Sequence, residues 1–178
     1  ESIVNMGTYD LKTSFTPDNK NFVCTMVEGS HLNKIVIRGR SVQITFNDLY
    51  ITYGDADPKF YDHIYISDTD ILKCDQNIQN AYQEYKDNNG GSAAGFDWSK
   101  YILITPEAVS SNLAVGRPYK ENGYKLTLEF LNKDNVVDPN YRAVRLITDE
   151  NGNATTTSET ARLYVRKFDL NSVYGDAE

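Results

Sequence analysis

Residues 34–67 read KIVIRGRSVQITFNDLYITYGDADPKFYDHIYIS, a succession of short apolar runs separated by turn residues. The runs are rich in β-branched and aromatic side chains, which pack well on a pleated sheet. The Gly, Asn, Asp and Pro residues between them favour turns, and we expect residues 34–46 to form a hairpin. The stretch therefore predicts a meander of antiparallel strands, with runs at 35–37, 42–46, 49–53 and 60–66.

The apolar period changes to that of a helix over residues 75–89. Ile78, Tyr82 and Tyr85 recur at positions i, i+4 and i+7 and form one apolar stripe. Asp75 is suited to cap the start of this helix, and the following Asn-Asn-Gly-Gly tolerates the backbone that ends one. The pattern predicts a helix of about three turns.

A second helix is predicted after a short strand at 101–104. Thr105 is suited to its cap, Pro106 to its first position, and Gly116 to the residue beyond its end. The remaining patterns are those of strands. They lie at 7–15, 22–27, 123–130, 141–148 and 160–168, and the last two are expected to pair across a long Thr-rich arm at 149–159.

These elements predict an α+β chain that is mainly antiparallel β, arranged as a sandwich or partly closed barrel with one or two flanking helices. A chain of 178 residues is long enough to bury a core as one domain. We expect residues 1–170 to form a single β-rich domain and residues 171–178 to form a polar C-terminal tail. Because the chain begins with Glu1 rather than Met, we expect it to be part of a longer product.

Composition and charge exclude several classes of partner. The formal net charge is -7, and the Lys and Arg residues are scattered along the sequence. Binding to nucleic acid phosphates requires clustered cations, so nucleic acid is not an expected partner. No run approaches the roughly 20 apolar residues of a membrane-spanning helix, so membrane insertion is not expected.

Two cysteines, Cys24 and Cys74, permit one disulfide outside a reducing compartment. The alternative is two buried thiols that behave as small apolar side chains. The sequence leaves both open. Neither cysteine belongs to a CxxC or Cys/His pattern of the kind that binds zinc.

Residues 55–70 contain an acidic cluster, and three of its members, Asp55, Asp57 and Asp62, are the candidate metal ligands. The whole cluster is Asp55, Asp57, Asp62, Asp68 and Asp70. Calcium takes six to eight oxygens, often from Asp side chains in adjacent loops. The stretch does not match an EF-hand loop, and Asp is also favoured at turns for its own hydrogen bonds. Calcium is therefore a candidate ligand here, beside the alternative of ordinary turns on a solvated rim.

Aromatic side chains near carboxylates and amides suggest a binding face. Aromatic planes stack on the C–H faces of sugars, while carboxylates and amides bind sugar hydroxyls. The same side chains suit a protein interface or a buried core, and the sequence leaves these alternatives open. The candidate binding residues are Phe96, Trp98, Tyr101, Tyr61 and Tyr65.

No pattern of residues indicates catalysis. The two histidines are His31, in a turn, and His63, beside Asp62 in a predicted strand. His63 as a base oriented by Asp62 is the functional alternative, and an ordinary strand residue is the interpretation that the sequence favours. The chain has no Gly-x-Ser-x-Gly nucleophile motif and no phosphate-binding loop. We therefore expect that the protein is not an enzyme.

The chain as a whole is β-rich, acidic and rich in Tyr, and it has an expected protruding arm and polar ends. Such features suit a non-enzymatic structural or interaction subunit of an extracellular or virion-type assembly, such as a phage or viral capsid, tail or decoration protein. Its expected partners are copies of itself or other assembly subunits. The alternative is a secreted carbohydrate- or ligand-binding β-domain, with calcium as a candidate aid.

Overall fold

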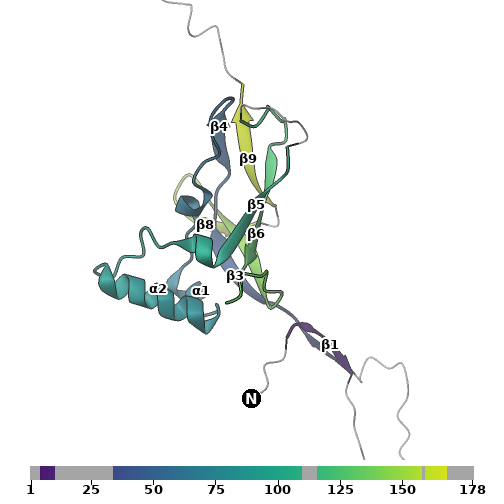
Figure 1. The fold of residues 1–178 in the computed structure, drawn as a ribbon, viewed down its shortest axis with the longest axis vertical. Helices are drawn as coiled ribbons and strands as arrows, with labels where there is room; N and C mark the ends of the chain where they lie inside the picture. Colours follow the sequence, from purple (N-terminus) through teal and green to yellow (C-terminus); the bar gives the residue numbers. More distant parts are fainter. Residues whose placement is uncertain (1–4, 11–33, 110–115, 158, 168–178) are drawn as a thin grey trace, which may run out of the picture. The chain divides into compact units, whose positions relative to one another are not determined.

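The structure is a computed structural model, and it describes residues 5–10, 34–109, 116–157 and 159–167. Backbone contacts divide the chain into two units, residues 1–39 and residues 40–178, and each is described by itself (Figure 1). The single domain expected over residues 1–170 stays a prediction. The tail expected at 171–178 lies outside the described residues.

The described part of the first unit is a two-stranded antiparallel ribbon. β1 (Gly7–Asp10) pairs with β2 (Lys34–Ile37), and Tyr9 lies opposite Ile35. The hairpin expected over residues 34–46 is therefore wrong, because β2 pairs with a strand that precedes it by more than twenty residues. Turn residues mark where a strand ends but do not say which strand becomes its partner. The strand expected at 22–27 lies outside the described residues.

The second unit contains a three-stranded sheet in the order β3-β7-β8. β3 (Arg40–Thr45) runs parallel to β7 (Tyr141–Thr148), and β7 is antiparallel to β8 (Ala154–Thr156). The chain turns back between β7 and β8 at Asn151-Gly152, where Gly152 has a φ of 81°. The protruding arm expected at 149–159 is therefore wrong, because a tight hairpin occupies its first part.

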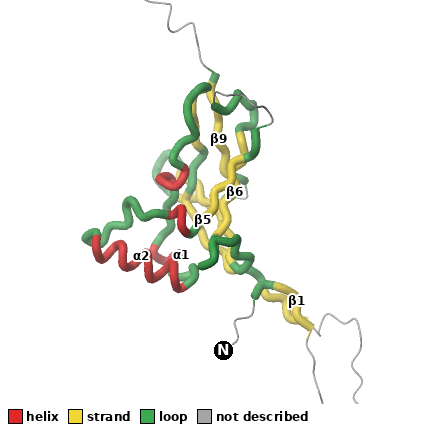
Figure 2. The backbone as a smooth tube through the Cα atoms, viewed as in Figure 1, coloured by secondary structure: helices red, strands yellow, loops and turns green. Residues whose placement is uncertain are grey.

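The second unit also contains a four-stranded sheet in the order β4-β9-β6-β5. Its strands are β4 (Leu49–Thr52), β9 (Ala161–Arg166), β6 (Tyr124–Phe130) and β5 (Ile102–Pro106). β4 is parallel to β9 and the other neighbours are antiparallel. Figure 2 labels three strands of this sheet, β9, β6 and β5.

Two predicted pairings are therefore wrong. The early strands do not form a local meander, since β3 and β4 take parallel partners from the last third of the chain. The expected pairing of 141–148 with 160–168 is also wrong, because β7 and β9 belong to different sheets. Both strands exist as predicted, but parallel pairing requires long connections that leave no local signal.

The helix predicted after residue 75 is confirmed. α2 (Gln76–Asn88) begins at Asp75, whose carboxylate accepts a hydrogen bond of 2.8 Å from the backbone N–H of Asn77. Ile78 and Tyr82 are its buried side chains, as the stripe predicts. α1 (Asp68–Ile71) lies beside it, tied by an ion pair of 2.7 Å between Lys86 and Asp68.

The other helix prediction is wrong at its beginning. Thr105 and Pro106 belong to β5, and Pro106 ends this edge strand, where its missing N–H costs no ladder bond. Residues 110–115 lie outside the described residues. The run expected as a strand at 60–66 is also different: it is the 3₁₀ turn η2 (Phe60–His63) followed by a single bridge between Tyr65 and Thr45.

The predicted fold class is confirmed: the described residues form an α+β fold, with mostly antiparallel and mixed sheets, two helices and a sheet that curls into a half-barrel. Val42, Ile44 and Phe46 alternate along the chain and all point to the interior, as period-2 strands require. The largest fully buried side chains come from both sheets, from the turn between β3 and β4 and from the segment after η2; they are Phe46, Phe130, Ile44, Ile66, Ile102, Leu126, Leu163 and Val42.

Candidate functional site

The aromatic residues predicted as a binding face form part of the core. Trp98 is 4% exposed and Phe96 is 9% exposed, and their ring centroids lie 4.8 Å apart at 70°. Tyr82 of α2 packs against both rings, and Tyr101 stacks on Phe96 at 5.6 Å. Because its ring is enclosed, Trp98 has no free face for a sugar. Of the alternatives left open by the sequence, the buried core is therefore the one that fits Phe96, Trp98 and Tyr101.

Tyr61 and Tyr65 do not join that cluster through any ring contact among the described residues. Tyr61 lies in η2 and packs partly against the core. Tyr65 is 61% exposed, although its backbone pairs with that of Thr45. The structure therefore divides the five predicted binding residues into an interior group and separate surface positions.

Two of the three predicted metal ligands, Asp55 and Asp57, are engaged in other contacts. The carboxylate of Asp55 accepts a hydrogen bond of 2.9 Å from the backbone N–H of Thr52 and so closes the turn after β4. Asp57 forms a bidentate ion pair with Arg117, with both N–O distances 2.7 Å. Asp62 is an exposed residue of η2. In the described part of the chain, no group of three or more His, Cys, Asp or Glu residues is placed to hold a metal ion. These residues therefore offer no described ligand set for calcium.

The histidine and cysteine predictions are tested only in part. His63 is exposed at the end of η2, while His31 and Cys24 lie outside the described residues. Cys74 is a free thiol, 2% exposed, whose Sγ lies 3.6 Å from the carbonyl oxygen of Asp70. Burial raises the pKa of this thiol to about 12, so it stays protonated at neutral pH and is a poor nucleophile.

Asp70, the last member of the acidic cluster predicted from the sequence, is a buried carboxylate. It is 5% exposed, and it accepts hydrogen bonds from the ammonium of Lys73 at 2.7 Å, the hydroxyl of Ser67 at 2.9 Å and the backbone N–H of Gln43 at 3.2 Å. Burial alone would raise its pKa, but these hydrogen bonds and the charge of Lys73 hold the pKa below the usual value. Asp70 thereby accepts a hydrogen bond from one backbone N–H, that of Gln43, at the open edge of β3. The Ser-x-x-Asp spacing is a visible capping signal that could have indicated its contact with Ser67.

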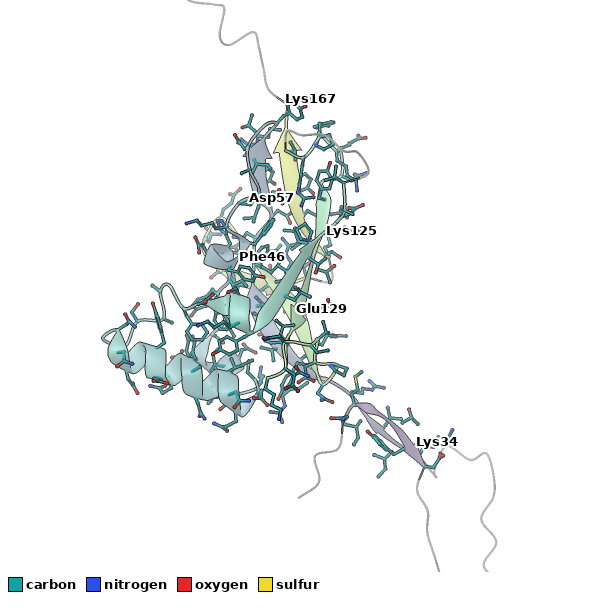
Figure 3. All side chains as sticks on the ribbon, in the orientation of Figure 1. Lys34, Phe46, Asp57, Lys125, Glu129 and Lys167 are labelled. Atoms are coloured by element: carbon teal, nitrogen blue, oxygen red, sulfur yellow. The ribbon has the colours of Figure 1, made fainter. Side chains whose placement is uncertain are left out.

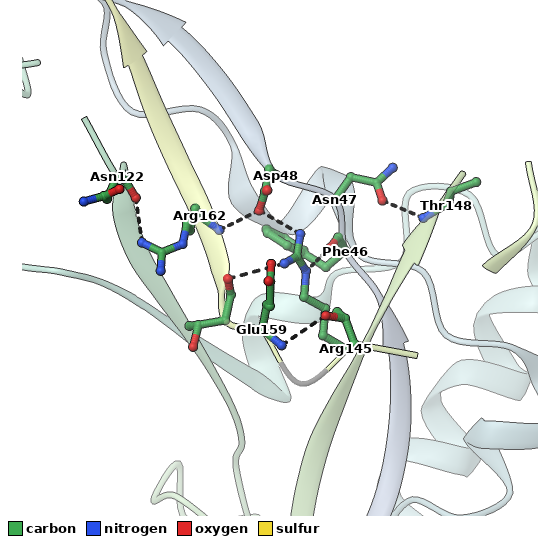
Figure 4. Close-up of polar contacts among 10 residues, drawn as sticks. Phe46, Asn47, Asp48, Asn122, Arg145, Thr148, Glu159 and Arg162 are labelled. Carbon is green, nitrogen blue, oxygen red and sulfur yellow. Dashed lines mark hydrogen bonds and ion pairs between the residues drawn. The ribbon is translucent and has the colours of Figure 1, made fainter. Parts of the chain in front are cut away.

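Arg145 joins the two sheets of the second unit (Figure 4). Its side chain is 9% exposed. The guanidinium donates to the carbonyl of Phe46 at 2.7 Å and to the carboxylate of Asp48 at 2.7 Å, where β3 leads into β4. The same carboxylate accepts the backbone N–H of Arg162 at the start of β9, at 2.9 Å. The partners lie about a hundred residues apart, so no sequence pattern announces this contact.

A hollow of about 350 Å³ lies between β6, β7 and the segment before β9. Its lining mixes aliphatic side chains with Arg142, Thr157 and Glu159. A second hollow of about 420 Å³ lies over α1 and α2, and amide side chains such as Gln76 and Gln79 line much of it. Neither lining brings together a nucleophile, a base and a group to orient the base.

The outward face of the four-stranded sheet carries a second aromatic group, Tyr50 and Tyr164. Tyr50 of β4 lies opposite Tyr164 of β9, and the two rings stack at 5.2 Å and 14°. The guanidinium of Arg166 lies 5.0 Å from the centre of the Tyr50 ring. Tyr164 fits because residue 123 is glycine: a Cβ there would lie 3.0 Å from the Tyr164 ring, and Gly123 has a φ of 62°.

Comparison with family models, with curated proteins and with solved structures gives no match to this chain. Among the residues that the structure describes, no helix is both long enough and apolar enough to cross a bilayer. We therefore argue function from the chain's own residues.

Proposed function

We propose that this chain is a non-enzymatic structural or interaction subunit of an extracellular or virion-type assembly, with copies of itself or other assembly subunits as partners. The observation that carries this proposal is the exposed ribbon of β1 and β2. Its apolar side chains remain in contact with solvent: Tyr9 is 38% exposed, Ile35 is 47% exposed and Val36 is 59% exposed. A partner that covers them would gain the free energy of their burial.

The ribbon has the geometry of a docking element. Tyr9, Ile35 and Ile37 share one face, because Tyr9 lies opposite Ile35 and strand residues alternate in direction. Among the described residues, β1 and β2 pair only with each other, so each strand keeps an open edge. An isolated two-stranded ribbon is only marginally stable in water. Addition to a neighbouring sheet would satisfy the open edges and cover the apolar face.

The residues that were predicted to bind sugar or calcium have structural roles, which favours an assembly subunit over a ligand-binding domain. Trp98 and Phe96 stabilise the interior, and Asp57 is neutralised by Arg117. These contacts stabilise the fold, so the presence of these residues in the chain does not require a bound ligand. The aromatic and acidic content of the sequence therefore lends less support to a binding site for small molecules.

Light scattering coupled to size-exclusion chromatography tests the proposal on the full chain. We expect the wild-type protein to form an oligomer that a calcium chelator does not dissociate. Ile35→Glu should reduce the mass of the oligomer, because a charge placed in an apolar contact is costly to bury. Leu103→Glu is the matched control, since Leu103 is an exposed apolar residue of β5. A monomeric wild type at high concentration would contradict assembly with copies of itself, and an oligomer that Ile35→Glu leaves unchanged would contradict the role of the ribbon.

The alternative of a secreted carbohydrate- or ligand-binding domain has one specific support, the 350 Å³ hollow beside Arg142 and Glu159. Its size falls in the range of small-ligand sites. A glycan screen with wild type and Thr157→Tyr tests it, because the larger side chain would fill part of the hollow. Binding that Thr157→Tyr abolishes would establish this function, and absence of binding would dismiss it.

A further inference from the structure

The outward face of β4, β9 and β6 combines tyrosines with cations. We name it the basic tyrosine face and define it by Tyr50, Tyr164, Lys125, Arg162 and Arg166. The strand register places Tyr50 opposite Tyr164 and Lys125 opposite Arg162. Arg162, Tyr164 and Arg166 are alternate residues of β9, so they point to the same side of the sheet. Along β9 the face therefore presents first Arg162, then Tyr164 with Tyr50 beside it, and then Arg166.

The face is open to solvent. Tyr50 is 56% exposed, Lys125 and Arg166 are exposed, and Tyr164 and Arg162 are half-buried. Lys167 continues the run of cations at the end of β9, with its ammonium 4.5 Å from the ring of Tyr119. Figure 3 labels Lys125 and Lys167 on this part of the molecule.

The positive charge of this face is only partly balanced among the described residues: the Glu107 carboxylate attracts the charge of Lys125 and accepts its backbone N–H at 3.1 Å. None of the ion pairs that the structure shows there includes Lys125, Arg162, Arg166 or Lys167. Glu129 is a carboxylate on the same side of β6 as Lys125, four residues further along the strand. Two other carboxylates near the face have cationic partners of their own. Asp48 pairs with Arg145 at 2.7 Å, and Glu107 pairs with Lys120 at 2.6 Å.

This local excess of positive charge occurs in a chain whose formal net charge is -7. Cations that outnumber the nearby carboxylates repel one another, and this repulsion slightly destabilises the folded state. An anionic partner would replace the repulsion with attraction. Charge complementarity therefore calls for an acidic partner on this face.

We propose that the basic tyrosine face binds an extended acidic segment of a partner polypeptide. Arg162 and Arg166 are four strand residues apart, about 13 Å at the rise of a β-strand. Carboxylates four residues apart on an extended segment have the same spacing and point to the same side. The tyrosine hydroxyls between the two cations can donate to the backbone carbonyls of such a segment.

The geometry of the tyrosines favours a polypeptide over a sugar or a nucleic acid. Sugars and bases stack on open aromatic faces. Here one face of Tyr50 is covered by Tyr164, and Arg166 lies over the same ring at 5.0 Å. The rings therefore present their edges and hydroxyls. This contact lies within residues 40–178, so it goes beyond the β1–β2 ribbon contact and does not depend on it.

Fluorescence anisotropy with a labelled decaglutamate peptide tests the proposal on the full chain at low salt. Two variants with the same change of net charge are compared. Arg162→Glu/Arg166→Glu reverses the face, and Lys59→Glu/Lys133→Glu reverses two exposed lysines elsewhere. We expect wild type and the lysine control to bind the peptide and the arginine variant to bind at least about tenfold more weakly. Far-UV circular dichroism and urea unfolding confirm that both variants are folded.

Three results would overturn the proposal. The first is no binding of the peptide by wild type at low salt. The second is an equal loss of binding in both variants, which would show that net charge alone attracts the peptide. The third is tighter binding of polygalacturonate or of a decathymidylate than of decaglutamate, with the same dependence on Arg162 and Arg166, which would assign the face to another class of anion.

Discussion

The second unit holds two groups of aromatic side chains with similar composition and opposite surroundings. Tyr82, Phe96 and Trp98 are each less than a tenth exposed and contact one another through their rings. Tyr50 and Tyr164 stack on the outward face of a sheet, beside Arg166. The inner group stabilises the fold through buried area, whereas the outer group keeps its polar edges available to a partner.

The arginines repeat this contrast. Arg145 is almost enclosed and donates to three groups on other segments, the carbonyls of Phe46 and Thr160 and the carboxylate of Asp48. Arg166 is exposed and contacts a tyrosine ring. The same residue type therefore holds the sheets together in one place and leaves a charge unbalanced in the other. Burial therefore decides whether an arginine or an aromatic side chain stabilises the fold or stays available to a partner. Substitutions at buried and exposed positions test this distinction.

The largest expected effect is at Trp98. Trp98→Ala should lower the free energy of unfolding by about 3–5 kcal/mol, because it removes a large side chain from a packed interior. Tyr65→Ala is the matched control from the same predicted binding set, and since Tyr65 is 61% exposed we expect a change within about 0.5 kcal/mol. Urea unfolding followed by circular dichroism measures both. Similar losses in the two variants would remove the distinction between interior and surface aromatics.

Arg145→Ala should follow, with a loss of about 2–4 kcal/mol, because the carbonyl of Phe46 and the carboxylate of Asp48 lose a shared, nearly enclosed donor. Arg166→Ala should change the free energy of unfolding by no more than about 0.5 kcal/mol. The comparison uses urea unfolding at neutral pH. A small effect at Arg145 would mean that the two sheets hold together without the contact shown in Figure 4.

Local patterns predicted the elements whose signals are contained in a few residues. The helix at α2 follows from its apolar stripe and the Asp75 cap, and β6 follows from its alternation. The partners of β3 and β4 could not be predicted, because they lie about a hundred residues further along the chain. Parallel and antiparallel strands also share the same local composition.

The site was predictable only as a set of residue types. Aromatic and acidic side chains drew attention to Trp98 and Asp57, but burial of the first and pairing of the second with Arg117 depend on tertiary contacts. The cations of β9 were visible in the sequence as Arg162 and Arg166. Their position beside stacked tyrosines became apparent only with the strand register. Sequence spacing shows which side chains share a strand face, but not which strand lies alongside.

Asp70 extends the comparison to buried charge. Asp70→Ala should cost about 1–3 kcal/mol at pH 7, because Lys73, Ser67 and the N–H of Gln43 lose their acceptor. The folded-state pKa of Asp70 is depressed, so its stabilising contribution is present above the unfolded pKa of about 3.9 and is lost as the pH falls through the folded value. The difference between wild type and variant should therefore shrink between pH 5 and pH 2. A difference that is constant over this range would show that the carboxylate charge has no part in it.

Apart from the two surface controls, the smallest expected effect on stability is at Tyr50, although its effect on binding should be clear. Tyr50→Ala should lower the free energy of unfolding by about 1 kcal/mol or less, because an exposed stacked pair contributes little beyond its area. Tyr50→Phe keeps the stack and removes only the hydroxyl, so it should leave stability unchanged while it weakens decaglutamate binding. Urea unfolding and peptide anisotropy on the same samples separate the two contributions. A loss of more than about 2 kcal/mol in Tyr50→Ala would place this ring with the structural aromatics such as Trp98, and the outward face would then need its tyrosines for folding.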